Sequence, residues 1–135
     1  MPDPIRVILV DDQSLVRSGF RMLIESEDDM EVVAEASNGV EALDVLRRMP
    51  VDVALMDIRM PQMDGVEATR RITASPLDTR VLILTTFDLD EYVYAALKAG
   101  ASGFLLKDAR PTGLLRGIRR RSLIQGSGCP RFAVC

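Results

Sequence analysis

Five polar residues in this sequence stand at or just after the end of a short apolar segment: Asp11, Asp12, Asp57, Thr85 and Lys107. Carboxylates that come together repel one another, and a cation among them relieves the repulsion. Oxygen ligands without histidine or cysteine favour a hard ion such as Mg²⁺, which keeps bound waters and phosphate oxygens. A lysine ammonium and a threonine hydroxyl can contact phosphate oxygens, and a carboxylate can act as a nucleophile. Together these residue types indicate phosphoryl transfer, which depends mainly on positioning and electrostatic stabilisation.

Each of these residues also has an ordinary structural explanation. Asp11 and Asp12 could cap a helix. Thr85 is at home in a strand, and Lys107 could be a surface charge. Asp57 could be a helix cap, a metal ligand or a nucleophile. All five stand at the ends of strand-like segments, so they are expected at the same edge of a sheet. This shared location is easier to explain by one functional site than by five separate structural roles.

Apolar segments with strand character alternate with helical patterns along most of the chain. Strands are expected at residues 5–10, 32–34, 51–56, 81–84 and 103–106. Helices are expected at 16–24, 40–46, 65–74 and 90–99, with a last one beginning near residue 114. This alternation predicts a parallel sheet that is covered by helices on both faces. Ligands of such sheets bind at the carboxyl ends of the strands, so the five polar residues are expected at one edge.

The helical spacing also predicts which side chains face the sheet. The buried stripe of the second helix is expected to contain Val40, Leu43 and Leu46. That of the third helix is expected to contain Val66, Thr69 and Ile72. Asp64, immediately before Gly65, is expected to cap the third helix.

The composition is that of a soluble globular protein. The 135 residues are 47% hydrophobic and 27% charged, which predicts a single domain with a sizeable core. The formal net charge of −3 and the pI near 5.0 argue against a broad basic surface for nucleic acid. No apolar run approaches the roughly 20 residues of a membrane span, and the N-terminus does not begin a secretory signal. We therefore expect a cytoplasmic protein without a membrane partner.

Histidine is absent, and the only cysteines are Cys129 and Cys135. This composition excludes Ser-His-Asp and Cys-His catalysis, histidine-ligated zinc and phosphohistidine chemistry on this chain. The cysteine spacing matches no zinc or redox motif, so both are expected to be free thiols in an irregular tail.

Four motifs resemble the receiver domain of bacterial two-component response regulators, in order and at the usual spacing. They are "VILVDDQSLVRSG", "DVALMDIRMPQMDG", "VLILTTF" and "AGASGFLLKDA". The resemblance runs from about Ile5 to Ile118. The longer stretch "TTFDLDEYVYAALKAGASGFLLKDA" is similar to receivers of the NarL/FixJ (LuxR-type) group of transcription factors. The fold that this resemblance implies is a flavodoxin-like (βα)5 three-layer sandwich with the strand order 2-1-3-4-5.

The resemblance assigns a role to each site residue. It implies that Asp57 is the phosphoacceptor and that Asp12, Asp57 and the backbone carbonyl of Arg59 bind Mg²⁺ or Mn²⁺. Asp11 would act mainly through water. It further implies that Thr85 and Lys107 contact the phosphoryl group. Phe104 occupies the position of a switch aromatic that responds to a shift of Thr85.

The resemblance also implies the function and the partners. A sensor histidine kinase would donate the phosphoryl group, and the chain would catalyse only its own phosphorylation and dephosphorylation. The resulting conformational change is expected to alter a face that carries Asp88, Asp90, Glu91, Lys98 and Arg110. That face is expected to support either phosphorylation-dependent homodimerisation or release of an output domain, and so to control transcription. DNA would be bound only by a C-terminal helix-turn-helix domain, which this chain lacks.

The end of the chain departs from the family pattern. Residues 1–121 are expected to form the receiver domain, and residues 122–135, "SLIQGSGCPRFAVC", an irregular tail that is disordered, altered or truncated. The basic cluster Arg116, Arg119, Arg120 and Arg121 is expected to be a solvated helix end, because cations suit a helix C-terminus.

Two other functions were compared with phosphoacceptance. A Mg²⁺-dependent phosphoesterase would need a second acid near the nucleophile, but Asp57-Ile58-Arg59 lacks one and no specificity cap is inserted. An unphosphorylated interaction module with the same fold would not need an intact set of Asp12, Asp57, Thr85 and Lys107.

Overall fold

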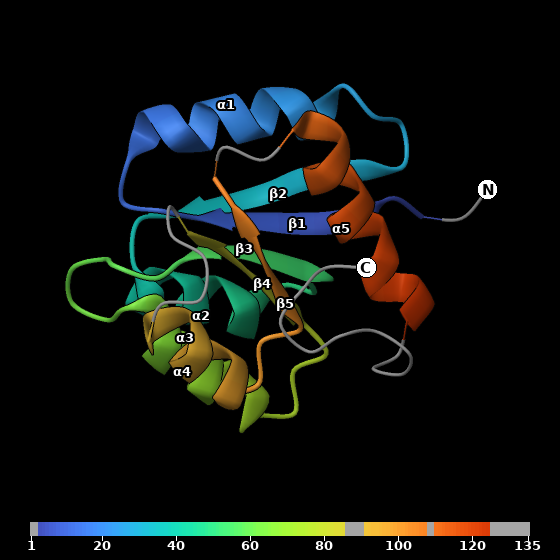
Figure 1. Ribbon diagram of the computed structural model, residues 1–135. Helices are drawn as coiled ribbons and strands as arrows, with labels where there is room; N and C mark the ends of the chain where they lie inside the picture. Colours follow the sequence, from blue (N-terminus) through green and yellow to red (C-terminus); the bar gives the residue numbers. More distant parts are fainter. Residues whose placement is uncertain (1–2, 86–90, 108–109, 125–135) are drawn as a thin grey trace.

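The computed structural model describes residues 3–85, 91–107 and 110–124, with side chains up to Arg120. Within these residues the strands are β1 (Ile5–Val10), β2 (Met30–Ala36), β3 (Val53–Asp57), β4 (Arg80–Thr85) and β5 (Gly103–Leu106). The helices are α1 (Ser14–Glu25), α2 (Gly39–Arg48), α3 (Gly65–Thr73), α4 (Glu91–Lys98) and α5 (Pro111–Ile124). The expected alternation of strands and helices is confirmed (Figure 1).

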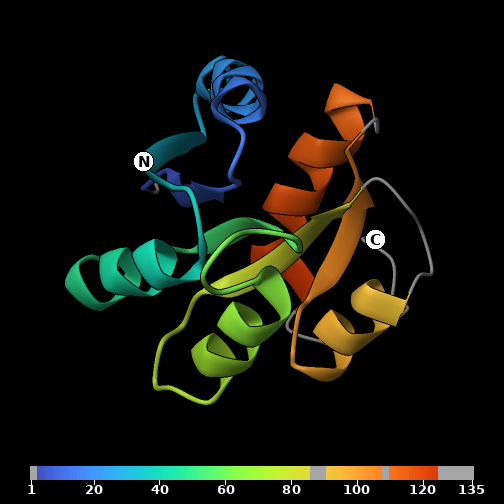
Figure 2. The same cartoon turned by 90° about the vertical axis from the view of Figure 1, so that its left-hand side faces the viewer.

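The strands form one parallel sheet in the order β2-β1-β3-β4-β5. Helices α1 and α5 cover one face, and α2, α3 and α4 cover the other (Figures 1 and 2). This is the flavodoxin-like sandwich that the sequence predicted. The chain passes from β1 outward to β2 and then returns to β3 on the other side of β1, so the point where ligands bind lies at the carboxyl ends of β1 and β3.

The two sides of the central strands pack against different helices. Val7 and Leu9 of β1 belong to the core shared with α1 and α5, whereas Ile8 and Val10 belong to the core under α2, α3 and α4. Because both sides are buried, these strands are continuously apolar, which explains why their sequence signal is strong.

Among the helices whose starts the structure describes, α2 and α3 begin with a side-chain cap. Asp64 Oδ1 accepts the Glu67 N–H at 2.9 Å at the start of α3, as predicted. Asn38 Oδ1 accepts the Glu41 N–H at 2.9 Å at the start of α2. The sequence pattern identified Asn38 only as part of a turn, whereas the structure makes it the helix cap.

The expected buried stripe of α2 is partly wrong. Val40 is 48% exposed, and Ala42 instead faces the core with Leu43 and Leu46. The buried face of α2 consists of Gly39, Ala42, Leu43 and Leu46, and Val40 lies beside it. The expected stripe of α3 is confirmed, because all three of its members are buried.

Three strands differ in their bounds from the expected ranges. Strand β4, Arg80–Thr85, extends one residue further at each end. Strand β2 is seven residues long rather than three, because it pairs with the whole of β1. Strand β3 begins at Val53 and includes Asp57, which pairs with Leu84 of β4. Asp57 therefore belongs to the sheet, and its backbone position is fixed by strand pairing.

Several expectations concern residues outside the described part of the chain. These are Asp88, Asp90, Cys129, Cys135 and most of the expected tail, residues 125–135. Helix α5 continues to Ile124, three residues past the expected end of the domain. Arg119, from the expected solvated cluster, pairs with Glu27 and Asp29 and so fastens α5 to the turn before β2. The Arg119 guanidinium holds the pKa of Asp29 below its usual value.

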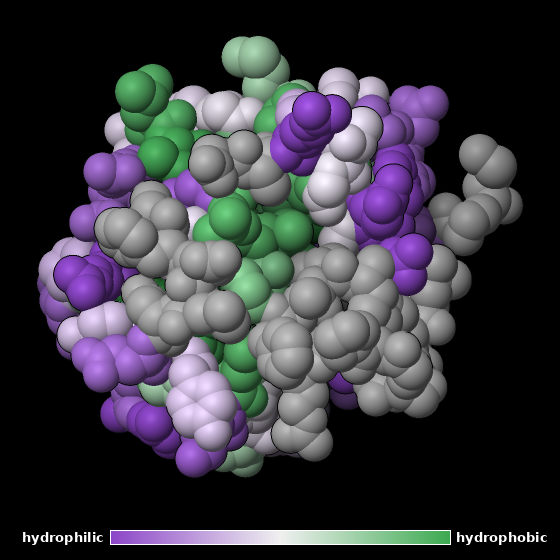
Figure 3. Space-filling model, viewed as in Figure 1, coloured by the Kyte–Doolittle hydropathy of each residue, from purple (hydrophilic) through white to green (hydrophobic). Residues whose placement is uncertain are grey.

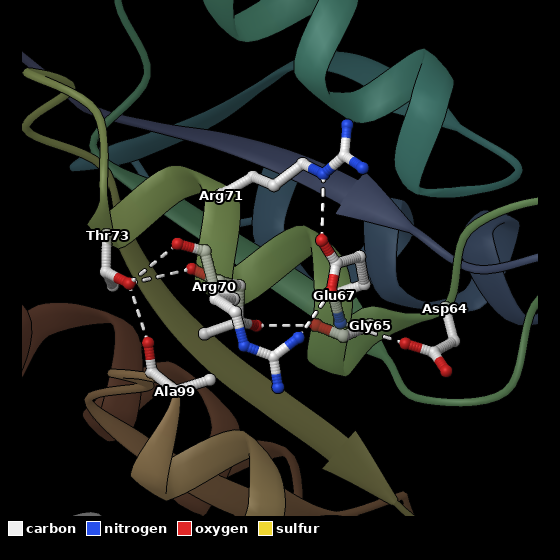
Figure 4. A network of polar contacts seen from close by, with 8 residues as sticks. Asp64, Gly65, Glu67, Arg70, Arg71, Thr73 and Ala99 are labelled. Atoms are coloured by element: carbon white, nitrogen blue, oxygen red, sulfur yellow. Dashed lines mark hydrogen bonds and ion pairs between the residues drawn. The ribbon is translucent and has the colours of Figure 1, made fainter.

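Helices α3 and α4 are joined at their carboxyl ends (Figure 4). Thr73 Oγ1 donates to the Ala99 carbonyl oxygen at 2.6 Å. Gly100 follows with a φ of 116°, a conformation that favours glycine, and a Cβ there would meet the Thr73 side chain at 2.4 Å. This close approach fixes the carboxyl end of α4 on α3.

Gly65 packs against the backbone of the strand that carries Asp57. Its N–H donates to the Ile58 carbonyl at 2.7 Å, and a Cβ would lie 2.2 Å from the Asp57 carbonyl oxygen. A side chain at this position would therefore push α3 away from the end of β3.

We predict opposite effects for two glycine-to-alanine substitutions in helices. Gly65→Ala should lower the free energy of unfolding by about 1–3 kcal/mol, because the new methyl group overpacks the Asp57 backbone. Gly19→Ala in α1 should raise it by roughly 0.5–1 kcal/mol, because its Cβ meets nothing within 4 Å and alanine favours helix. Urea unfolding followed by circular dichroism measures both, and a stabilising Gly65→Ala would contradict the close approach.

Candidate functional site

Strand pairing brings the predicted acids together. Val10 pairs with Met56, so Asp11 follows β1 directly beside Asp57 at the end of β3. One carboxylate oxygen from each of Asp11, Asp12 and Asp57 lies within 4.8 Å of the others. The grouping expected from the sequence is therefore present at the carboxyl edge of the sheet.

Lys107 comes to the same place from the other end of the sheet. Thr85 pairs with Leu106, and the Thr85 carbonyl accepts the Lys107 N–H at 2.7 Å. The Lys107 ammonium then lies 3.1 Å from Asp11 Oδ2 and 3.3 Å from Asp57 Oδ1. A single cation thus bridges two carboxylates from adjacent strands.

The surroundings shift the proton affinity of both partners. Burial raises the pKa of Asp57 and the charge of Asp11 raises it further, while Lys107 and the Ile58 N–H partly offset this effect. Burial alone would lower the pKa of Lys107, but its contacts with Asp11 and Asp57 raise it overall. Lys107 therefore stays charged, and a further positive charge near Asp57 would favour its ionised form.

Asp11 is the most buried of the three acids. Its Oδ1 accepts the Gln13 N–H at 2.9 Å, which orders the turn before α1. Its Oδ2 is buried and receives no hydrogen bond of good geometry from the described residues, although the Lys107 ammonium lies near it. The N-cap of α1 is Gln13, and its side chain makes no capping hydrogen bond. The alternative explanation of Asp11 and Asp12 as helix caps is therefore wrong.

The oxygen-only donor set fits a hard divalent ion. Three carboxylates converge, one of their oxygens is buried without a hydrogen bond from the described residues, and Asp12 is exposed where an ion with bound waters could enter. The residues present are therefore compatible with Mg²⁺ at this edge.

The remaining predicted site residues surround this group. Thr85 is buried at the end of β4, and its carbonyl accepts the backbone N–H of Lys107. Phe104 is half-buried and packs against the core under α2, α3 and α4. Arg59 is exposed in the segment that follows β3, with its guanidinium carbon 4.6 Å from the centre of the Tyr92 ring.

Three contributions to the site were not predicted from the sequence. Gly65 supports the Asp57 backbone, Arg17 donates from α1 to the Asp11 carbonyl, and Tyr92 receives the Arg59 side chain. The Asp64-Gly65 pair can be recognised in the sequence as a helix start and could have indicated the role of Gly65. The other two are contacts between distant segments and have no local sequence signal.

Comparison with known proteins identifies the family. The family model described as the response regulator receiver domain matches residues 7–119. The chain is 46% identical over 117 residues to the uncharacterized transcriptional regulatory protein YxjL of Bacillus subtilis, which covers 87% of this chain. It is 40% identical over 121 residues to the nitrate/nitrite response regulator protein NarP of Escherichia coli, which covers 88% of this chain. The chain spans about half the length of these curated relatives, 54% of YxjL and 56% of NarP.

A solved structure agrees with the sequence comparison. The response regulator domain of CheB from Thermotoga maritima superposes with a TM-score of 0.83 at 31% identity, and the match covers 90% of this chain and 98% of that domain. No helix among the described residues is long and apolar enough to cross a membrane. With this fold, this family match and a cluster of three acids at the expected edge, the chain belongs to the response regulator receiver domains of two-component signalling, in their NarL-type group.

Proposed function

We propose that this chain accepts a phosphoryl group on Asp57 from a sensor histidine kinase. The observation that carries the proposal is the position of Asp57, which is fixed in the sheet, adjacent to Asp11 and in contact with Lys107. A carboxylate oxygen of Asp57 attacks phosphorus as the P–N bond of the donor phosphohistidine breaks. The donor imidazole leaves with the bond's electrons and takes up a proton, and Asp57 becomes an acyl phosphate.

Mg²⁺ or Mn²⁺ would be held by Asp12, Asp57 and the Arg59 carbonyl. Asp11 would act through water, and its buried Oδ2 is the oxygen that such a hydrated ion would satisfy. When bound, the ion would supply positive charge for the entering phosphoryl oxygens.

Lys107 and Thr85 carry the response to phosphorylation. Before transfer the Lys107 ammonium balances two carboxylates, and afterwards it can pair with a phosphoryl oxygen instead. The Thr85 hydroxyl donates to a second phosphoryl oxygen, and the space that its shift leaves lets Phe104 turn inward. Asp57, Thr85 and Lys107 are thus the reacting and phosphoryl-binding residues, with Phe104 as the switch.

The output of this switch is the face formed by α4, β5 and α5. Figure 3 shows hydrophobic surface running down the middle of this face, where β5 lies in Figure 1. Three of the four β5 residues, Phe104, Leu105 and Leu106, are only partly buried. A rearranged apolar strip is suited to homodimerisation or to release of an output domain. The chain would act in the cytoplasm. DNA would be bound by a C-terminal domain of a longer regulator, and the chain would not hydrolyse other phosphoesters.

Helix α1 offers a surface for the kinase beside the acceptor. It starts three residues after Asp11, and Leu15 and Met22, one above the other on the helix, are 83% and 76% exposed. Large apolar side chains exposed next to a reaction site commonly mark a protein partner.

We predict that acetyl phosphate with Mg²⁺ adds one phosphoryl group to the chain. Intact-mass measurement should find a single adduct on the wild type and on Asp64→Asn, whose asparagine keeps the α3 cap. Asp57→Asn should give no adduct because the nucleophile is gone. An adduct that persists in Asp57→Asn would overturn the proposal, and turnover of general phosphoesters would favour a phosphoesterase instead.

We predict that Mg²⁺ stabilises the protein through the acid cluster. At a concentration 100-fold above its dissociation constant the ion should add about 2.7 kcal/mol to the free energy of unfolding. Asp12→Asn and Asp57→Asn should lose most of this gain, whereas Asp64→Asn should keep it. Thermal unfolding with and without Mg²⁺ measures the difference, and equal gains in all four proteins would refute the assignment of the ligands.

The same unfolding experiment without Mg²⁺ tests how much the ionised Asp57 carboxylate destabilises the fold. Folding raises the pKa of Asp57, so the ionised carboxylate subtracts stability as the pH rises through its folded-state pKa. Asp57→Asn should therefore be more stable than the wild type at neutral pH, and the difference should disappear below the unfolded-state pKa. A less stable metal-free Asp57→Asn would mean that the Lys107 contact outweighs the repulsion.

We predict that Leu15→Glu slows phosphorylation by a sensor kinase but leaves acetyl phosphate reactivity unchanged. A central anchor residue contributes roughly 2 kcal/mol or more to an interface, so loss of Leu15 in that role should lower the transfer rate at low concentration at least roughly tenfold. Val40→Glu on α2, which also replaces an exposed apolar residue, is the matched control. Equal transfer rates for both variants would rule out α1 as the docking surface.

A further inference from the structure

The Arg59 side chain connects the acceptor segment to helix α4. Arg59 lies two residues after Asp57, and Tyr92 lies in the first turn of α4. The Arg59 guanidinium carbon is 4.6 Å from the centre of the Tyr92 ring, which is the geometry of a cation–π contact. The contact therefore joins the segment that carries the phosphoacceptor to a helix of the output face.

Arg59 has no carboxylate partner among the described residues. Seven other arginines among the described residues each pair with an acid: Arg6, Arg17, Arg21, Arg48, Arg70, Arg71 and Arg119. The guanidinium of Arg59 instead rests on an aromatic face, where an exposed cation is held only weakly. A phosphoryl dianion on Asp57 would offer charge-assisted hydrogen bonds, which are stronger than this contact.

The opposite end of α4 is fixed. The Thr73 hydroxyl donates to the Ala99 carbonyl, and Gly100 packs against Thr73 (Figure 4). Val93 and Ala96 are buried against the core. The Tyr92 contact is therefore made at the end of α4 that lies away from this anchor.

We propose that Tyr92 is a positioning residue that holds the Arg59 guanidinium before phosphorylation and releases it to the phosphoryl group of Asp57 afterwards. This inference rests on the proposed function and adds a second connection, besides Thr85 and Phe104, between the site and α4. Phosphorylation withdraws the cation from Tyr92, and the first turn of α4 loses its tie to the acceptor segment while Thr73 keeps the other end in place.

The chain provides a direct reporter, because it has only two tyrosines and no tryptophan. In fluorotyrosine-labelled Tyr94→Phe protein, the single ¹⁹F resonance belongs to Tyr92. It should move when acetyl phosphate and Mg²⁺ phosphorylate Asp57, and Arg59→Gln should move it without phosphorylation. The control is labelled Tyr92→Phe, in which Tyr94 reports. Lys98 lies 5.2 Å from the Tyr94 ring centre within the same helix, so this resonance should change less.

Intact mass of the same samples separates the two ideas. If no adduct forms, the proposed function fails. If the adduct forms and the Tyr92 resonance stays in place, or moves no more than that of Tyr94, the positioning role is overturned.

Kinetics provide a second test with a double-mutant cycle. Tyr92→Leu frees Arg59 to meet an incoming dianion, so the acetyl phosphate concentration at half-maximal rate should fall about two- to fivefold, the equivalent of about 0.5–1 kcal/mol. The maximal rate should not change, and Tyr92→Phe, which keeps the ring, should behave as the wild type. In an Arg59→Gln background, Tyr92→Leu should have no further effect. An equal effect in both backgrounds would show that Tyr92 acts only through the packing of α4 and would overturn the proposal.

Discussion

The contact of one ammonium group with two carboxylates sets the charge at the carboxyl edge of the sheet. Asp11 and Asp57 are adjacent because their strands pair, and their mutual repulsion is balanced by Lys107 at 3.1 and 3.3 Å. Burial, and after it the charge of Asp11, still raise the pKa of Asp57, so the ammonium offsets only part of the cost of its ionised form. A site with residual negative charge and one bridging cation is suited to a reversible reaction. Such a site would favour a divalent ion among the acids, and with that ion bound the lysine could turn to a new anion without leaving the acids unpaired.

Much of the remaining structure keeps this group of charges in place. The strand register sets the spacing of Asp11, Asp57 and Lys107, and the two cores hold the strands from both faces. Gly65 lets α3 begin against the Asp57 backbone, and Asp64 caps that helix. Asp57 therefore has little freedom to move, while Arg59, two residues later, is exposed and rests on the Tyr92 ring. A fixed carboxylate beside a more exposed cation would suit the switch proposed above.

The sequence was sufficient for the fold and for most of the site because both depend on short-range signals. Continuous apolar strands, Gly65 after Asp64, and polar residues at strand ends can each be identified locally. The strand boundaries were less predictable, because pairing with β1 extends β2 and pairing with β4 includes Asp57 in β3. Val40 was misplaced because an apolar residue at helical spacing can lie beside the buried face, which Gly39 and Ala42 complete here. The contacts of Arg17 with Asp11 and of Arg59 with Tyr92 join distant segments, so only the folded chain reveals them.

The place of β5 in the sheet links the charge of the site to the local stability of the fold. This strand has four residues and lies at the edge, so it is hydrogen-bonded to β4 alone. Edge elements with few partners open more readily than central strands, without unfolding of the whole domain. Lys107 follows directly after this strand, so each such opening would remove the balancing cation from the two acids while β1 and β3 stay intact. Local opening of β5 would therefore change the charge around Asp57, even though Asp57 itself lies on the central strand β3.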